Sequence, residues 1–293
     1  MLEISKFALS AAVILVALAA VAFVAGLTTS RRPAPVMAGA GGPSVPSTSL
    51  ETGTTATRGV AWYGSQLTLA GFIAMSIWFI ARTIVVKHAP FANQYEFACA
   101  FGWGMLAFYV YFERRHQARF LGIALLPMAL AVLIYAATRD DITKPLMPAL
   151  QSPFMLTVHV FLAVLGYGAG GVASAAGILY LLKPKVNWAA LPSRERLDEL
   201  GYRAVVFSFP LLTMMNIQGA IWANNAWGKY WSWDPKETAA LVTWLIYGAY
   251  IHARVTKGWQ GNRSAWLLIL GFGAIIFTFL GNHFFGGMHS YGG

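Results

Sequence analysis

Long apolar runs are the feature that most restricts how this chain can fold. Crossing a bilayer as a helix takes about 20 predominantly apolar residues. Runs near or above that length lie at about 7–27, 62–86, 95–112, 118–138, 153–182, 201–223, 236–257 and 264–287. In hydrocarbon the backbone polar groups must be satisfied within the segment, so such runs form helices. The sequence therefore predicts an all-α, polytopic integral membrane protein with about eight transmembrane helices.

Composition agrees with this class and excludes a nucleic-acid partner. Of the 293 residues, 57% are hydrophobic and 11% are charged, with a formal net charge of +10. A nucleic-acid-binding protein gathers its basic residues along one solvated face, whereas here they form short clusters between apolar runs. The clusters are topology signals, and the surroundings that the composition implies are membrane lipid.

The basic clusters recur in every second connection between runs. They contain Arg31, Arg32 and Arg58, then Arg114, Arg115 and Arg119, then Lys183, Lys185, Arg194 and Arg196, and finally Lys257 and Arg263. Loops rich in Lys and Arg face the cytoplasm. The connections around 87–94, 139–152 and 223–235, together with both termini, are therefore predicted on the outer side of a bacterial plasma membrane or a thylakoid membrane.

Three regions follow along the chain. Residues 1–27 are predicted to be an N-terminal transmembrane helix that is retained, because Arg31 and Arg32 follow it in place of a cleavage site. Residues 28–59 combine Pro, Gly, Ser and Thr and predict a flexible cytoplasmic linker. Residues 60–293 form the main membrane domain, with an external Trp-rich loop at 222–237.

The Trp-rich loop contains four Trp and one Tyr within the sixteen residues Trp222–Glu237. Rings at this density are typical either of an aromatic belt at the membrane interface or of a surface that stacks on a planar, mostly apolar ligand. Asp234, Pro235 and Glu237 have the spacing of an N-cap, a first helical position and a capping box. We therefore expect a helix to begin here and to hold the loop in place.

Three histidines are candidates for a ligand site. His159 and His289 are predicted at the outer membrane surface, at the level of the Trp-rich loop, and two imidazoles on opposite faces of a macrocycle can hold haem iron. His252 is predicted about 25 Å further toward the cytoplasm. It is either an interfacial residue or a ligand of a second site, whose other axial ligand would come from another polypeptide.

Other features are interpreted as structural. His116 belongs to a solvated basic cluster, and Cys99 lies alone within an apolar run and is expected to be a buried hydrophobe. The glycines within 153–182 are expected to let neighbouring helices approach closely.

The segment Trp227–Glu237, WGKYWSWDPKE, resembles the WWD signature of haem-handling proteins in cytochrome c biogenesis. The segments His88–Glu96 and 287–292 (GMHSYG) resemble the CcsA/ResC branch, the membrane subunit of the System II cytochrome c synthase. The likeness runs from about residue 60 to the end of the chain.

The resemblance implies a function and a set of site residues. The protein would move haem b (iron protoporphyrin IX) outward and present it for thioether attachment to the C-x-x-C-H motif of apocytochrome c, as part of a two-protein haem lyase. His159 and His289 would ligate the presented haem, and His252 would ligate a haem within the membrane. The remaining predicted cofactor-binding residues surround the presented haem: Trp227, Trp231, Trp233, Asp234 and Lys229.

Partners follow from the same resemblance. A CcsB/ResB-type membrane protein would supply the second ligand of the inner haem, because this chain carries no such portion, and a thioredoxin-like protein would reduce the apocytochrome thiols. Lys229 is a candidate partner for a propionate, or simply a solvated loop cation.

Two other functions compete with this interpretation. A CcmC-type haem exporter shares the WWD loop but performs no ligation, and the Pro-Lys-Glu ending and eight spans argue against it. A b-type electron-transfer cytochrome usually has paired ligand histidines on core helices. The wide spacing of His159, His252 and His289 argues against that function.

Overall fold

The computed structural model describes residues 1–29, 59–142, 146–186, 188 and 191–281. These residues form eight α-helices and two short 3-10 helices, with no strand among them. In chain order the elements are α1 (Leu2–Thr29), α2 (Val60–Val86), α3 (Gln94–His116), η1 (Arg119–Leu121), α4 (Gly122–Ala137), η2 (Pro148–Leu150), α5 (Pro153–Leu182), α6 (Arg194–Trp227), α7 (Pro235–Lys257) and α8 (Asn262–Leu280). The predicted all-α membrane fold is confirmed.

Six segments within the described residues are long and apolar enough to cross a membrane, and they correspond to α1, α2, η1 with α4, α5, α6 and α8. The helices α3 and α7 fall short because charged residues lie at both of their ends. Each nevertheless contains 23 residues and packs within the bundle, α3 against α5 and α4, and α7 against α8. Eight crossings therefore stay a prediction.

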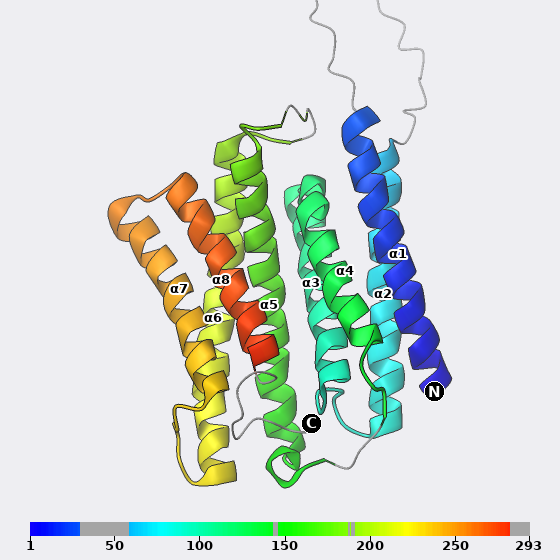
Figure 1. Ribbon diagram of the computed structural model, residues 1–293, viewed down its shortest axis with the longest axis vertical. Coiled ribbons are helices and arrows are strands. Elements are labelled where there is room, and N and C mark those ends of the chain that lie inside the picture. The colour runs from blue at the N-terminus through cyan, green and yellow to red at the C-terminus, as the bar shows by residue number, and fades with distance from the viewer. Residues whose placement is uncertain (30–58, 143–145, 187, 189–190, 282–293) are drawn as a thin grey trace, which may run out of the picture.

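Successive helices run up and down, so their connections separate into two ends of the bundle (Figure 1). The helix ends that carry Arg114, Arg115, Arg194 and Arg263 lie at one end, and the α6–α7 connection lies at the opposite end with the first residues of α1. The alternation expected from the basic clusters is thus present in the fold.

The N-terminal helix α1 packs against α2 and α4. Its buried residues Ala12, Val16 and Phe23 belong to the main hydrophobic core, so α1 is part of the bundle. Most of the predicted linker 28–59 lies outside the described residues.

The backbones of α3 and α5 meet at a pair of glycines. A Cβ atom on Gly168 would lie 2.4 Å from the carbonyl oxygen of Gly104, and one on Gly104 would lie 2.5 Å from that of Val164. Cys99, on the same helix α3, is fully buried and free, as predicted. Small residues therefore set the distance between the two helices.

We expect Gly168→Ala to destabilise the protein by about 1–3 kcal/mol, because the new methyl group must push two backbones apart. The matched control is Gly273→Ala in α8, where an added Cβ meets nothing within 4 Å. Thermal unfolding in detergent should show a lower midpoint for the first variant only. Equal midpoints for the two variants would contradict the close-packing argument.

Candidate functional site

A cavity of about 300 Å³ lies at the end of the bundle that carries the α6–α7 connection. Its volume is at the lower bound of the range common for small-ligand pockets, about 300–1,000 Å³. Apolar and aromatic side chains from the 87–93 connection, from α3, α5, α6, α7 and α8 and from the α6–α7 connection form most of its wall. The lining includes Phe91, Phe97, Leu156, Val160, Tyr167, Met215, Trp222, Trp227, Tyr230, Trp231, Ala240 and Phe279.

His159 projects into this cavity from the second turn of α5. Its ring packs edge-on against Trp222 of α6, with ring centroids 5.5 Å apart. A Cβ atom on Gly219 would lie 2.7 Å from the imidazole Cε1, so the absence of a side chain on α6 makes room for the ring. Helix α6 thus supplies both a wall and a recess for His159.

The Trp-rich segment is partly helical. Helix α6 continues to Trp227 and ends where Gly228 adopts a left-handed φ of 73° and donates its N–H to the Asn224 carbonyl. The open part of the connection is therefore residues 228–234, shorter than the expected 222–237 loop. The last turn of α6 and the loop together place Trp227 and Trp231 on the cavity wall.

The loop is held by the first turn of α7. Asp234 caps the helix through the Lys236 N–H and completes the predicted capping box with Glu237, which is confirmed. The Glu237 carboxylate also accepts hydrogen bonds from the backbone N–H and the hydroxyl of Ser232, at 2.8 and 3.0 Å. One carboxylate therefore fixes two loop residues as well as the helix start.

Trp233 adopts a left-handed φ of 59°, which is rare for a bulky residue, between two residues that Glu237 holds. Its ring contacts Trp231 edge-on at 5.7 Å and is 70% exposed. Trp233, Asp234 and Lys229 are not among the residues that line the cavity. Their predicted contacts with a ligand stay predictions.

Besides His159, the cavity wall contains several polar side chains, among them Asn216 and Lys236. The Nδ2 atom of Asn216 is buried and has no hydrogen-bond partner among the described residues. Lys236 also lines the cavity, 6.0 Å from the centre of the Phe97 ring, and forms no ion pair within the described part of the chain. The nearby Asp234 carboxylate is engaged in capping α7.

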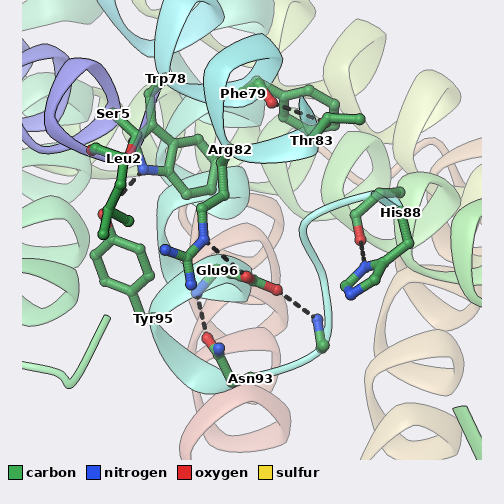
Figure 2. Close-up of polar contacts among 12 residues, drawn as sticks. Leu2, Ser5, Trp78, Phe79, Arg82, Thr83, His88, Asn93, Tyr95 and Glu96 are labelled. Carbon is green, nitrogen blue, oxygen red and sulfur yellow. Dashed lines mark hydrogen bonds and ion pairs between the residues drawn. The ribbon is translucent and has the colours of Figure 1, made fainter. Parts of the chain in front are cut away.

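A buried ion pair positions another wall of the cavity. The Arg82 Nε of α2 lies 2.9 Å from Glu96 Oε1 of α3, and the two side chains are 0% and 1% exposed. The second Glu96 oxygen accepts the Ala92 N–H at 2.9 Å, and Asn93 caps α3 through the Glu96 N–H (Figure 2). Ala92 and Asn93 line the cavity, so the ion pair holds this wall in place.

The three predicted histidine ligands have different outcomes. His159 lies in the cavity, His252 is exposed near the other end of α7, and His289 lies outside the described residues. One exposed face of α7 carries Val242, Leu245 and His252. The roles of all three as iron ligands stay predictions.

Sequence reasoning did not single out Lys236, Asn216 or Gly219 as site residues. Lys236 stands in the quoted motif, but its position in the first turn of α7 is what directs it to the cavity. Asn216 and Gly219 lie within an apolar run, where nothing in a single sequence marks them.

Fold and site together define an all-helical membrane protein with an aromatic, histidine-containing cavity at one end. The family model described as "Cytochrome C assembly protein" matches residues 91–289. The chain belongs to this family of cytochrome c biogenesis proteins, as the WWD-like motif predicted.

Cytochrome c biogenesis proteins align with this chain over most of its length. The cytochrome c biogenesis protein CcsA of Guillardia theta is 37% identical over 263 residues, covering 80% of this chain and 87% of the relative. CcsA of Synechococcus sp. (strain JA-3-3Ab) is 36% identical over 296 residues, covering 78% and 86%. The solved structure of the cytochrome c haem lyase CcmF shares the fold, with a TM-score of 0.67 at 18% identity. That likeness covers 95% of this chain and 46% of CcmF.

Proposed function

We propose that this protein is the membrane subunit of a cytochrome c synthase, which moves haem outward and presents it in the cavity for attachment to apocytochrome c. One observation carries the proposal: His159, two motif tryptophans and the cation Lys236 share one cavity beside the Trp-rich loop. The family's role in cytochrome c biogenesis supports the same conclusion.

The residues present fit haem. The macrocycle is planar and largely apolar, and the wall offers Trp227, Trp231 and Phe97 as surfaces for it. His159 offers a nitrogen ligand for iron, and His289 is its proposed second ligand. Lys236 offers a charge to the polar edge of the ligand, and Asn216 offers its Nδ2, which has no hydrogen-bond partner in the described part of the chain.

The chemistry proposed for the site is addition of each apocytochrome thiol across a haem vinyl group, which needs no further oxidant. The contribution of this chain is to bind and orient haem while the C-x-x-C-H segment approaches. A thioredoxin-like protein would keep the two thiols reduced.

The sidedness of the protein follows from the proposal. The end of the bundle that carries Arg114, Arg115, Arg194 and Arg263, here called the Arg-rich end, faces the cytoplasm. The cavity faces the outer side, in accordance with the positive-inside rule. His252 is proposed to ligate a second haem together with a histidine of a CcsB/ResB-type partner. Its exposure on α7 leaves it accessible to such a partner.

The function is tested by producing the chain with its CcsB/ResB-type partner and an apocytochrome in a host without its own maturation system. Covalent haem on the apocytochrome, detected by mass and by haem staining after denaturation, is the expected result. Haem release without thioether formation would favour the exporter function instead. A complex that binds no haem would contradict the proposal.

The charge of Lys236 gives a prediction about the ligand. If its ammonium binds a haem propionate, Lys236→Met should weaken the binding of haem by about tenfold, the size expected for loss of one charged hydrogen bond. The dimethyl ester of haem has no carboxylates, so its binding should change little. Absorbance titration of the detergent-purified complex measures both affinities.

Lys229→Met is the matched control, because Lys229 is exposed and does not line the cavity. Lys229 was the propionate partner considered from the sequence. Wild type is expected to bind haem more tightly than the dimethyl ester. If Lys229→Met abolishes this difference in affinity while Lys236→Met leaves the difference intact, Lys229 binds the propionate and the assignment to Lys236 is wrong.

A further inference from the structure

A second hollow lies at the Arg-rich end of the bundle, between the last turns of α3 and the first half of α6. Its volume is about 410 Å³, and it is separate from the haem cavity. Its lining residues are Tyr111, Arg115, His116, Glu199, Tyr202, Arg203, Val206 and Phe207. We call this hollow the α3–α6 groove.

The part of the groove nearer the middle of the bundle is apolar and open to the surroundings. Tyr111, Val206 and Phe207 are 42%, 46% and 41% exposed. The rings of Tyr111 and Phe207 meet edge-on at 5.6 Å and join the two helices. In a membrane protein such a surface faces lipid chains.

The part at the end of the bundle is cationic. Arg115 forms no ion pair within the described residues, whereas Arg203 Nε pairs with Glu199 Oε1 at 2.8 Å. Arg196 donates to the backbone carbonyl of His116 at 2.9 Å, which brings a third guanidinium to the rim.

The electrostatic state of His116 reflects this surplus of positive charge. Partial burial and the guanidiniums of Arg203, Arg115 and Arg196 hold the pKa of its imidazole below the usual value. Glu199 is the acidic residue that lines the groove, and it contacts both Arg203 and Arg254. The rim therefore retains a net positive charge that an anion can neutralise.

We infer that the α3–α6 groove binds one anionic phospholipid of the leaflet at this end of the bundle. The phosphodiester would lie among Arg115, His116 and Arg203, and an acyl chain would lie along Tyr111, Val206 and Phe207. Basic pockets between transmembrane helices recognise lipid headgroups in this way. The apolar portion distinguishes this occupant from a soluble phosphate, which needs no such surface. The inference is independent of haem binding.

The test is native mass spectrometry of the full chain in detergent, titrated with phosphatidylglycerol or with phosphatidylcholine of the same acyl chains. Wild type should retain phosphatidylglycerol in preference to phosphatidylcholine. Arg115→Gln should lower phosphatidylglycerol retention by roughly fivefold, the effect expected for one cation at an anionic headgroup. A third arm adds inorganic phosphate, which should not displace the lipid.

Arg114→Gln is the matched control, because Arg114 is the preceding residue, carries the same charge and does not line the groove. It should retain the wild-type preference. An equal loss in the two variants would mean a diffuse charge effect and would overturn the site. Equal binding of the two lipids by wild type, or displacement by inorganic phosphate, would overturn it as well. Thermal unfolding midpoints of both variants check that the fold is intact.

Discussion

Replacing His159 by alanine is expected to weaken haem retention in the cavity beside the α6–α7 connection by at least tenfold, about 1.4 kcal/mol or more. The imidazole is held by two features of α6, the edge-on contact with Trp222 and the recess at Gly219. Its removal would take away the proposed iron ligand and leave a space of similar shape. Added imidazole should therefore restore the haem spectrum, which absorbance of the purified complex measures.

His88→Ala is the control for this experiment. His88 lies at the same end of the bundle, where its Nδ1 is 2.8 Å from the Ala89 carbonyl, and it does not line the cavity (Figure 2). Its substitution should leave the haem spectrum unchanged. Normal haem retention by His159→Ala, or an equal loss in His88→Ala, would contradict the assignment of His159.

Replacing Arg82 by methionine is expected to destabilise the protein by about 3–5 kcal/mol, because Glu96 would remain buried without its cation. Glu96 also accepts the Ala92 N–H, so a displaced carboxylate would release the 87–93 connection from α3. The cavity proposed to bind haem would lose a wall along with the stability. The thermal unfolding midpoint in detergent and the haem affinity measured by titration should both fall.

The double variant Arg82→Met with Glu96→Gln separates charge from packing. Glutamine keeps an acceptor for the Ala92 N–H but carries no charge, so the double variant should be more stable than Arg82→Met alone. The guanidinium carbon of Arg82 lies 5.2 Å from the centroid of the Tyr95 ring. A double variant that is as unstable as Arg82→Met alone would mean that the lost stability comes from this packing.

Helix positions were predictable where a local physical signal exists. The start of α7 follows from the capping-box spacing of Asp234 and Glu237, and α5 spans 153–182 as the apolar run predicts. The apolar run 201–223 predicted a helix that is shorter than α6 at both ends. Ser193 caps a charged first turn that hydropathy does not register, and the helix continues through polar Asn224 and Asn225 until Gly228.

The candidate site was predictable only in part. The sequence identified the motif tryptophans Trp227 and Trp231 and the histidine His159 as candidates, and the structure brings them to one cavity. Which of the two nearby lysines faces that cavity was not predictable. Lys229 lies in the open loop, whereas the first turn of α7 directs Lys236 inward.

The sequence by itself determined that this chain is a helical membrane protein, because apolar length and backbone hydrogen bonding leave few alternatives in lipid. It also determined the family, through a motif that is contiguous along the chain. Only the tertiary structure decided the cavity, since its walls come from residues near 91–97, 150–167, 215–240 and 278–279. The packing of helices far apart in sequence decides which side chains converge, and that packing depends on close contacts such as the one between Gly104 and Gly168.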